Sequence, residues 1–280
     1  MSAEHLIADM EYGMNVLRKI RTLVTHPSPF RLMTARFGSK LGFHLVADFF
    51  GIQIRLGRSG LSQAIYADGG GKWSADALFL NANLSPGDVY VDVGANIGTL
   101  ACLAAKRIGE QGICVAFEPH PKTYSELVTN VHLNKLNVIA LMLAMGGGGE
   151  FVNFTDLRED DQNHVTPAQE GEVISVYMSS LDEILPGILG ERRIRLLKID
   201  TEGFEFFVLK GAAKIIRRVD MIYFEISDSM LQSNGISSFE LLDFLRTHGF
   251  TVKYPNGEIL PDYSKLQFAE TQNLLAVAGK

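Results

Sequence analysis

The chain has 280 residues, of which 46% are hydrophobic and 21% charged, and its formal net charge is −6. This composition is typical of a soluble globular protein with one large domain, or one domain and an extension. The negative charge argues against a nucleic-acid partner, and the lack of a run of about 18 apolar residues argues against a transmembrane segment.

The N-terminal residues 1–45 are expected to form a helical extension. Met10, Met14, Leu17 and Ile20 recur on one side of a helix. Acidic residues stand where a secretory signal would be basic or apolar, so we expect no such signal. The helix is expected to pack on the main domain or on a second subunit, which makes a homo-oligomer possible.

The main domain is expected to span residues 46–280, with its core at 85–280. Residues 46–72 suggest a short β-hairpin, followed by a loop at 69–71. The cysteines, Cys102 and Cys114, both lie in apolar stretches. We expect them to be buried free thiols, as in a cytoplasmic protein.

From residue 85 onward, apolar runs of strand length alternate with segments of helical periodicity. The predicted strands are 89–93, 112–117, 137–143, 195–200, 221–226, 250–254 and 273–278. The predicted helices are 97–108, 121–133, 204–218 and 238–247. Near-continuous apolar strands separated by helices indicate an α/β fold, in which a mostly parallel sheet carries helices on both faces.

The last two predicted strands are joined without a crossover helix. Pro255, Gly257 and Pro261 would interrupt the helix that a parallel connection needs. We therefore expect 250–254 and 273–278 to be antiparallel neighbours. A seven-stranded sheet with a reversed last strand is typical of Rossmann-like class I methyltransferases, and it differs from the sheet of dinucleotide dehydrogenases.

A glycine-containing turn follows the first of these strands. From Asp92 to Gly98 the chain reads D-V-G-A-N-I-G, and Gly94 and Gly98 allow a sharp turn close to a ligand. The dinucleotide fingerprint G-x-G-x-x-G would need glycine at Asn96 and Thr99. The remaining pattern suits S-adenosylmethionine (SAM), whose ammonium and sulfonium favour a nearby acid. A plain strand-to-helix turn is the alternative interpretation.

A second acid ends the next predicted strand. Glu118 follows the apolar residues Cys114 to Phe117. At the carboxyl end of the neighbouring strand, a carboxylate can accept hydrogen bonds from both hydroxyls of a ribose. We therefore interpret Glu118 as ribose-binding, with a solvated loop acid as the alternative.

Charged residues interrupt the apolar segment 195–212. Lys198 lies within a predicted buried strand, where an unpaired ammonium is costly. Asp200 and Glu202, at the strand end, are its expected partners. These acids could form an internal ion network, or they could lie where cofactor and substrate meet. The two interpretations are compatible. Glu225 ends the next strand in a similar way.

In this order, the strings VDVGANIG, AFEPHP, LLKIDTEGFE, VLKGA and IYFEIS resemble the FkbM family of SAM-dependent methyltransferases. The resemblance covers about residues 75 to 280, and K-I-D-x-E-G-x-E is its most specific element. It implies SAM as cofactor and methyl transfer, typically to hydroxyls of sugars or natural products. The implied cofactor-binding residues are Asp92, Gly94, Ala95, Asn96, Gly98, Glu118, Pro119 and Asp200. The implied acceptor-side residues are Asp200, Glu202 and Glu225.

A hydroxyl nucleophile gains from a general base, worth about 10²–10⁴-fold in rate. The candidates are Asp200, Glu202 and His164. For His164, the alternative interpretation is a solvated loop histidine. His164 lies in the polar, acidic connection 155–172, which is long enough to be functional. Clustered carboxylates could instead bind a metal, but Lys198 favours neutralisation without one, so no metal is expected.

The leading prediction is therefore a SAM-dependent O-methyltransferase with a small-molecule or glycosidic acceptor. The acidic connection suits a neutral or cationic acceptor better than a phosphorylated one. The alternatives are an amide or peptide N-methyltransferase, a SAM-binding protein without turnover and, least favoured, a nicotinamide dehydrogenase.

Overall fold

The computed structural model describes residues 45–57, 60–68, 74–157, 163–166, 172–263 and 266–279. The helical extension predicted for 1–45 and the loop predicted at 69–71 lie outside the described residues, apart from residue 45. Within the described ranges every helix is too short or too polar to cross a membrane. Cys102 and Cys114 are buried free cysteines.

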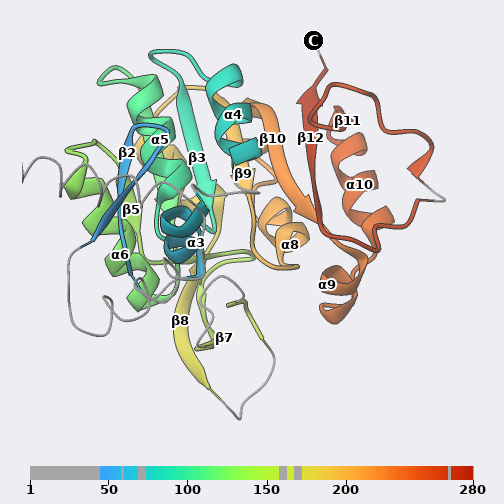
Figure 1. Cartoon of the computed structure of the whole chain (residues 1–280). Helices are drawn as coiled ribbons and strands as arrows, with labels where there is room; N and C mark the ends of the chain where they lie inside the picture. Colours follow the sequence, from blue (N-terminus) through green and yellow to red (C-terminus); the bar gives the residue numbers. More distant parts are fainter. Residues whose placement is uncertain are drawn as a thin grey trace, which may run out of the picture.

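A seven-stranded sheet forms the centre of the molecule (Figure 1). Its strands, in sheet order, are β11 (Phe250–Lys253), β12 (Gln272–Ala278), β10 (Val219–Ile226), β9 (Ile194–Ile199), β3 (Val89–Val93), β4 (Ile113–Phe117) and β5 (Ile139–Leu141). Strand β12 is antiparallel to both of its neighbours, and the other pairs are parallel. The predicted fold class and the antiparallel last strand are confirmed.

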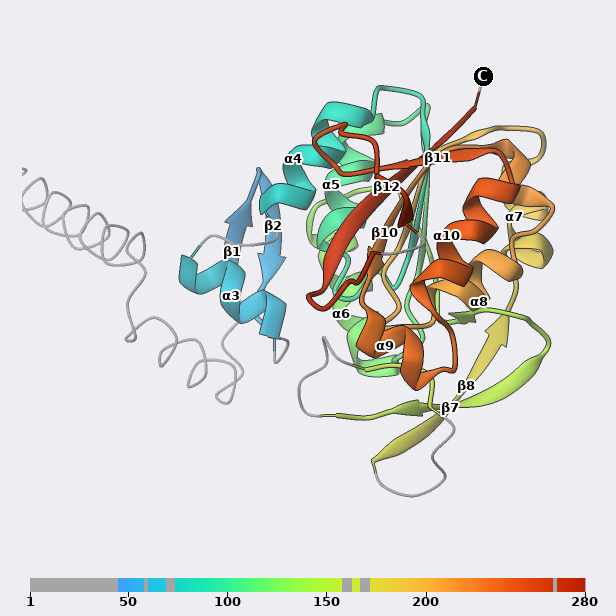
Figure 2. The same cartoon turned by 90° about the vertical axis from the view of Figure 1, so that its right-hand side faces the viewer.

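Helices cover both faces of this sheet (Figure 2). One face packs against α3 (Gly60–Asp68), α4 (Ser74–Asn83), α5 (Thr99–Ile108) and α6 (Pro121–Leu133). The other packs against α7 (Leu181–Leu189), α8 (Glu205–Lys210), η3 (Ile215–Arg218), α9 (Asp228–Ser233) and α10 (Ser238–Thr247). We call the first the pocket face and the second the apolar face.

Alternation along the strands explains how one sheet carries two different faces. On the apolar face, Ile199 and Phe224 are register neighbours near the strand ends, and both are fully buried. On the pocket face, Asp92 pairs in register with Lys198, and Lys198 with Tyr223. The pocket face therefore turns polar at the carboxyl ends of its strands, while the apolar face does not.

Several elements differ from the sequence-based expectation. The predicted hairpin forms from β1 (Val46–Phe49) and β2 (Ile52–Arg55), but helix α3 follows it. The helix predicted at 204–218 is divided into α8 and η3. A Cβ on Gly211 would lie 1.9 Å from the carbonyl oxygen of Gly146, so the chain passes a second segment there. Helix α7 was not predicted, because proline and glycine, here Pro186 and Gly187, usually interrupt a helix. Its start nevertheless carries a capping box formed by Ser180 and Glu183.

A second, three-stranded sheet lies beyond the carboxyl ends of the central strands. Its strands are β6 (Ala144–Met145), β8 (Val173–Ser179) and β7 (Glu150–Thr155), and β7 and β8 project from the body (Figure 1). The connection predicted as a long loop at 155–172 joins these two strands. An isolated bridge between Phe154 and Val165 holds its described part against β7.

Candidate active site

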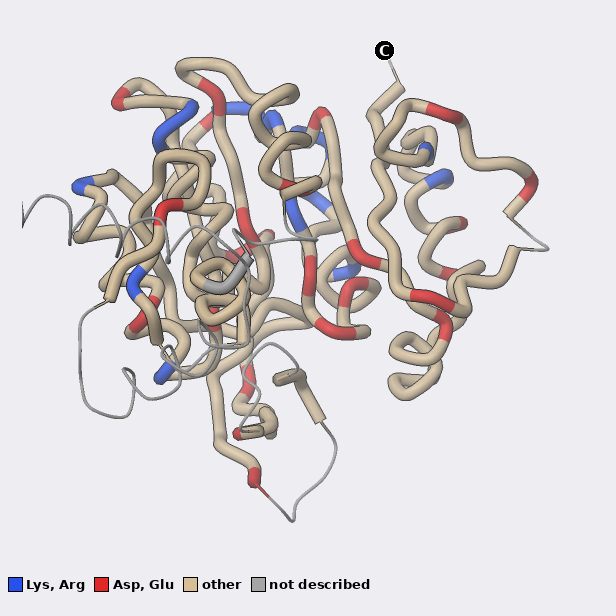
Figure 3. The backbone as a smooth tube through the Cα atoms, viewed as in Figure 1, with Lys and Arg blue, Asp and Glu red and all other residues tan. Residues whose placement is uncertain are grey.

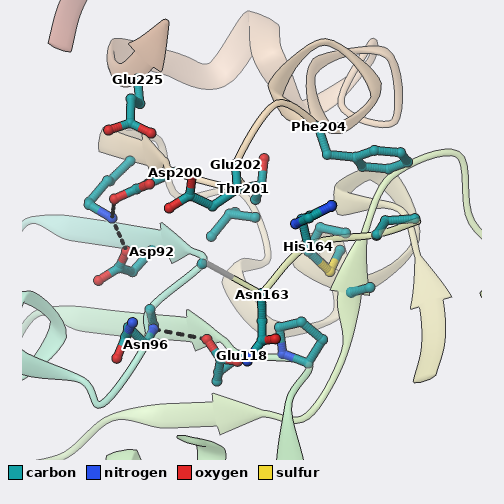
Figure 4. A pocket seen from close by; sticks show the side chains of 18 of the residues that line it. Asp92, Asn96, Glu118, Asn163, His164, Asp200, Thr201, Glu202, Phe204 and Glu225 are labelled. Atoms are coloured by element: carbon teal, nitrogen blue, oxygen red, sulfur yellow. Dashed lines mark hydrogen bonds and ion pairs between the residues drawn. The ribbon is translucent and has the colours of Figure 1, made fainter. Parts of the chain in front are cut away.

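A cavity of about 670 Å³ opens where β3, β4, β9 and β10 end (Figure 4). Almost all the predicted site residues line it: Asp92, Gly94, Ala95, Asn96, Glu118, Pro119, His164, Asp200, Glu202 and Glu225. Gly98 does not. It begins helix α5, and a Cβ at Gly98 would lie 2.8 Å from Cγ of Leu127 on α6. Its position serves the packing of two helices.

The turn after β3 brings the chain against the end of β9. Gly94 has φ +78°, and a Cβ there would lie 1.8 Å from the carbonyl oxygen of Asp200. Only glycine is compatible with this approach. The amide of Asp200 also donates to the carbonyl of Val93 at 3.0 Å. The glycine thus places the Asp92 and Asp200 segments side by side.

Glu118 holds the second wall of the cavity. Its carboxylate accepts hydrogen bonds from the backbone amides of Asn96 and His120, each at 2.9 Å, and the residue is 6% exposed. Asn96 adopts φ +50°, a conformation that asparagine tolerates better than most residues. A carboxylate oxygen has further lone pairs, so Glu118 can accept a ligand hydroxyl as well.

Lys198 pairs with two acids from different strands. Its Nζ lies 3.1 Å from Oδ2 of Asp200 and 3.4 Å from Oδ1 of Asp92. Asp200 was an expected partner. A further partner is Asp92, because Asp92 and Lys198 are register neighbours on one face. The sequence alone does not show which strands are adjacent.

Burial affects the pKa values of both Asp92 and Lys198. Asp92 is fully buried, and neither of its oxygens accepts a hydrogen bond within the described part of the chain. Burial raises the pKa of Asp92, and Lys198 opposes that shift. Burial would lower the pKa of Lys198, but Asp200 and Asp92 hold it above its ordinary value. Lys198 is therefore a permanent cation on the cavity floor.

Three carboxyl groups, one of them the Lys198 partner Asp200, lie close together in the cavity. Asp200, Glu202 and Glu225 each offer an oxygen within 4.8 Å of the others. Burial, followed by the charges of Asp200 and Glu202, raises the pKa of Glu225 to about 9. One buried oxygen of Glu225 accepts no hydrogen bond from the described residues. Oxygens at this spacing could also bind a divalent cation, and the expectation of no metal stays a prediction.

The motif K-I-D-x-E-G-x-E also contains a structural acid. Glu205 is 2% exposed, and its Oε1 accepts hydrogen bonds from the amides of Thr201 and Gly203 at 2.9 and 3.2 Å. This carboxylate holds the turn in which Glu202 adopts φ +54°. The turn therefore directs Asp200 and Glu202 into the cavity.

His164 lines the cavity from the far side. Its backbone pairs with Thr155 of β7, and Figure 4 shows its side chain directed toward Thr201 and Phe204. Apolar side chains that no sequence motif indicated complete this wall: Leu143, Met145, Phe154 and Phe204. Leu143 follows β5, Met145 and Phe154 belong to the second sheet, and Phe204 is the N-cap of α8, so these side chains meet only in the folded chain.

Asp76 is the acidic residue of the described cavity lining that sequence reasoning missed. It lies in the first turn of α4, and its Oδ1 accepts hydrogen bonds from Tyr223 Oη at 2.6 Å and Asn273 Nδ2 at 3.0 Å. Burial raises the pKa of Asp76. No motif surrounds it, and its partners are 147 and 197 positions away. The sequence holds no signal that would have found it.

The residues present fit SAM. The cavity is in the size range of cofactor sites. The buried Asp92 oxygens can accept hydrogen bonds from the ammonium group of SAM, and Glu118 can accept them from the ribose hydroxyls. Apolar side chains of the cavity can contact the adenine. SAM would thus be held from Asp92 on β3 to Glu118, which directly follows β4.

Comparison with known proteins gives one family. The model of the "Methyltransferase FkbM domain" matches residues 92–252, more than half of the chain. "Hexuronic acid methyltransferase AglP" of Haloferax volcanii is 30% identical over 140 residues, covering 50% of this chain and 56% of the relative. "Methyltransferase 1" of Beauveria bassiana is 30% identical over 148 residues, covering 45% and 59%. "Methyltransferase sdnD" of Sordaria araneosa is 28% identical over 228 residues, covering 69% and 85%. The chain thus spans less than two thirds of the first two relatives.

Proposed function

The chain belongs to the FkbM methyltransferase family, and from this premise we propose that it binds SAM in the cavity and methylates a hydroxyl of a sugar or natural product. The observation that carries the proposal is that Asp92, Glu118 and Asp200 line the same cavity. The range that matches the family model, residues 92–252, includes all three residues, which supports the proposal.

The cofactor-binding residues divide the work between two strands. The turn from Gly94 to Asn96 would hold the methionine end, with Asp92 accepting its ammonium. Glu118 and the neighbouring Pro119 would hold the ribose. Asp200 borders both the cofactor and the acceptor, because Gly94 and Asp200 are in direct contact.

The acceptor side needs alignment and a proton acceptor. When bound, SAM supplies a methyl group that its sulfonium already activates. The protein therefore has to orient the nucleophile and exclude water. Asp200, Glu202 and His164 are the candidates for accepting the hydroxyl proton, and Glu225 lies beside them. The name of the Haloferax relative, a hexuronic acid methyltransferase, supports a sugar among the possible acceptors.

The test is methyl transfer from radiolabelled SAM to methyl glycosides and, in parallel, to peptides. We expect label in the glycosides as a methyl ether. The variants Asp200→Asn and His164→Ala report on the acceptor side, and loss of a general base should lower kcat about 10²–10⁴-fold. Asp243→Asn, on the exposed surface of α10, is the matched control.

The alternatives give different results. Label in peptide nitrogen would support an N-methyltransferase. SAM binding without transfer to any acceptor, unchanged by Asp200→Asn, would indicate a binding protein without turnover. Either result would contradict the proposed O-methylation.

A further inference from the structure

The carboxylate of Asp76 is held in a fixed position at the cavity wall. Within the described part of the chain, Asp76 accepts two hydrogen bonds, from Tyr223 and Asn273, and both fall on Oδ1. Phe79, one turn further along α4, stacks on the ring of Tyr223 at 4.2 Å between centroids. Helix α4 is thus fastened to β10 and β12 at this point. Because Asp76 lines the cavity, a ligand can reach the remaining oxygen.

The register of the sheet places Asp76 beyond the cofactor. Asn273 lies directly opposite Glu225, and Tyr223 precedes Glu225 by two residues, so all three side chains share the pocket face. Glu118 follows β4, three strands away from β10 in the order β10-β9-β3-β4. At about 4.8 Å per strand, the two ends are roughly 14 Å apart. Asp76 therefore lies at the end of the cavity opposite the ribose site.

Acidic side chains outnumber basic ones around the cavity as a whole. Among the described residues lining the cavity, Lys198 is the sole lysine or arginine, against six carboxyl groups: Asp76, Asp92, Glu118, Asp200, Glu202 and Glu225. Figure 3 shows acidic positions, in red, in a band where the central strands end. Lys198 is already paired with Asp92 and Asp200. An acceptor entering here meets carboxylate oxygens that can receive hydrogen bonds and repel negative charge.

We propose that Asp76 is a specificity-determining residue of the acceptor subsite, whose Oδ2 accepts a hydrogen bond from an ammonium or hydroxyl group of the acceptor and disfavours a carboxylate. The inference rests on the proposed function, because it places the acceptor next to a SAM molecule bound between Asp92 and Glu118. Asp76 lies outside the matched range 92–252, so this part of the specificity comes from a segment that the family model does not include.

The test compares three ligands of one size and different charge. Methyl glucosaminide, methyl glucoside and methyl glucuronide are titrated into the full chain loaded with S-adenosylhomocysteine, with binding followed by ligand-observed NMR. We expect the affinity to fall in that order. Asp76→Asn keeps the shape of the side chain and removes its charge, so the preference for the glucosaminide over the glucuronide should fall about tenfold. Asp243→Asn removes an exposed acid elsewhere and should leave the preference unchanged.

A second variant keeps the test valid if Asp76→Asn folds poorly. Tyr223→Phe removes one of the two hydrogen bonds to Asp76 and keeps its charge, and it should reduce the preference by a smaller factor. A merely structural role would change the affinities of the three glycosides equally. Equal binding of the three by the wild type, tightest binding of the glucuronide, or no binding at millimolar concentration would overturn the inference, as would an unchanged preference in Asp76→Asn.

SAM is titrated into the same samples to separate the two proposals. Normal SAM binding by the wild type and by Asp76→Asn, with an unchanged glycoside preference, overturns this inference and leaves the proposed function standing. Failure of the wild type to bind SAM overturns the proposed function, and this inference with it.

Discussion

The two faces of the central sheet are built from the same strands and end differently. On the apolar face, Val93, Ile199 and Phe224 stay buried to the carboxyl ends of their strands. One residue earlier, on the pocket face, the same strands carry Asp92, Lys198 and Tyr223. The comparison teaches that neighbouring positions of one strand serve different purposes: one packs in the core of the apolar face, and the one before it brings a polar side chain toward the cavity.

The largest effect should come from a truncation on the apolar face. Phe224→Ala removes a fully buried ring, and we expect a loss of about 3–5 kcal/mol in the free energy of unfolding. Tyr223→Phe, the adjacent residue on the pocket face, removes one hydrogen bond and should cost about 1 kcal/mol. Urea denaturation measures both. Equal losses would contradict the division between the faces.

A comparable loss should follow on the pocket face when its buried ion pair is broken. Lys198→Met leaves the carboxylate of Asp92 buried without a counter-charge, which should cost about 3–5 kcal/mol. Adding Asp92→Asn should restore part of this stability, because the uncompensated charge is then removed. The double-mutant cycle is measured by denaturation. Strictly additive losses would show that the pair is not coupled.

A smaller effect concerns pH. The pKa of Glu225 is raised to about 9 by burial and by Asp200 and Glu202, from an ordinary value of 4.5. Between these values the unfolded chain is ionised at this position and the folded chain keeps its proton. The stability from this group is therefore complete below the lower value and falls as pH rises toward the higher one.

Glu225→Gln removes this titration. The wild-type free energy of unfolding should fall more steeply than that of the variant between about pH 5 and about pH 8. Denaturation curves across that range, in buffers free of divalent cations, give both slopes. Parallel pH profiles would contradict a protonated Glu225 in the folded protein.

Part of the pocket face could be predicted from the sequence, because the strands and helices that form it have recognisable residue patterns of their own. Strong local patterns made the ends of four continuous segments recognisable: helix α6, the strands that carry Asp92 and Glu225, and the strand that ends just before Glu118. The antiparallel tail followed from a connection with two prolines. The acids that directly follow a strand, Glu118 and Asp200, line the cavity, and their roles there stay a prediction.

The rest depends on which segments become neighbours in the folded chain. Asp76 reaches the cavity only because α4 packs on β10 and β12. Asp92 became the partner of Lys198 through strand order, which no local pattern encodes. The second sheet was not predicted, because its strands are short or lie beside the polar connection that was interpreted as a loop.

The most direct test of the account is a calorimetric titration of SAM, S-adenosylhomocysteine and NAD into three proteins. These are the wild type, Glu118→Ala on the pocket face and the control Ile199→Val on the apolar face. We predict that SAM and S-adenosylhomocysteine bind and NAD does not, that Glu118→Ala weakens SAM binding about tenfold or more, and that Ile199→Val leaves it unchanged. Binding of NAD alone, or SAM binding that is indifferent to Glu118→Ala, would contradict a SAM site on the pocket face.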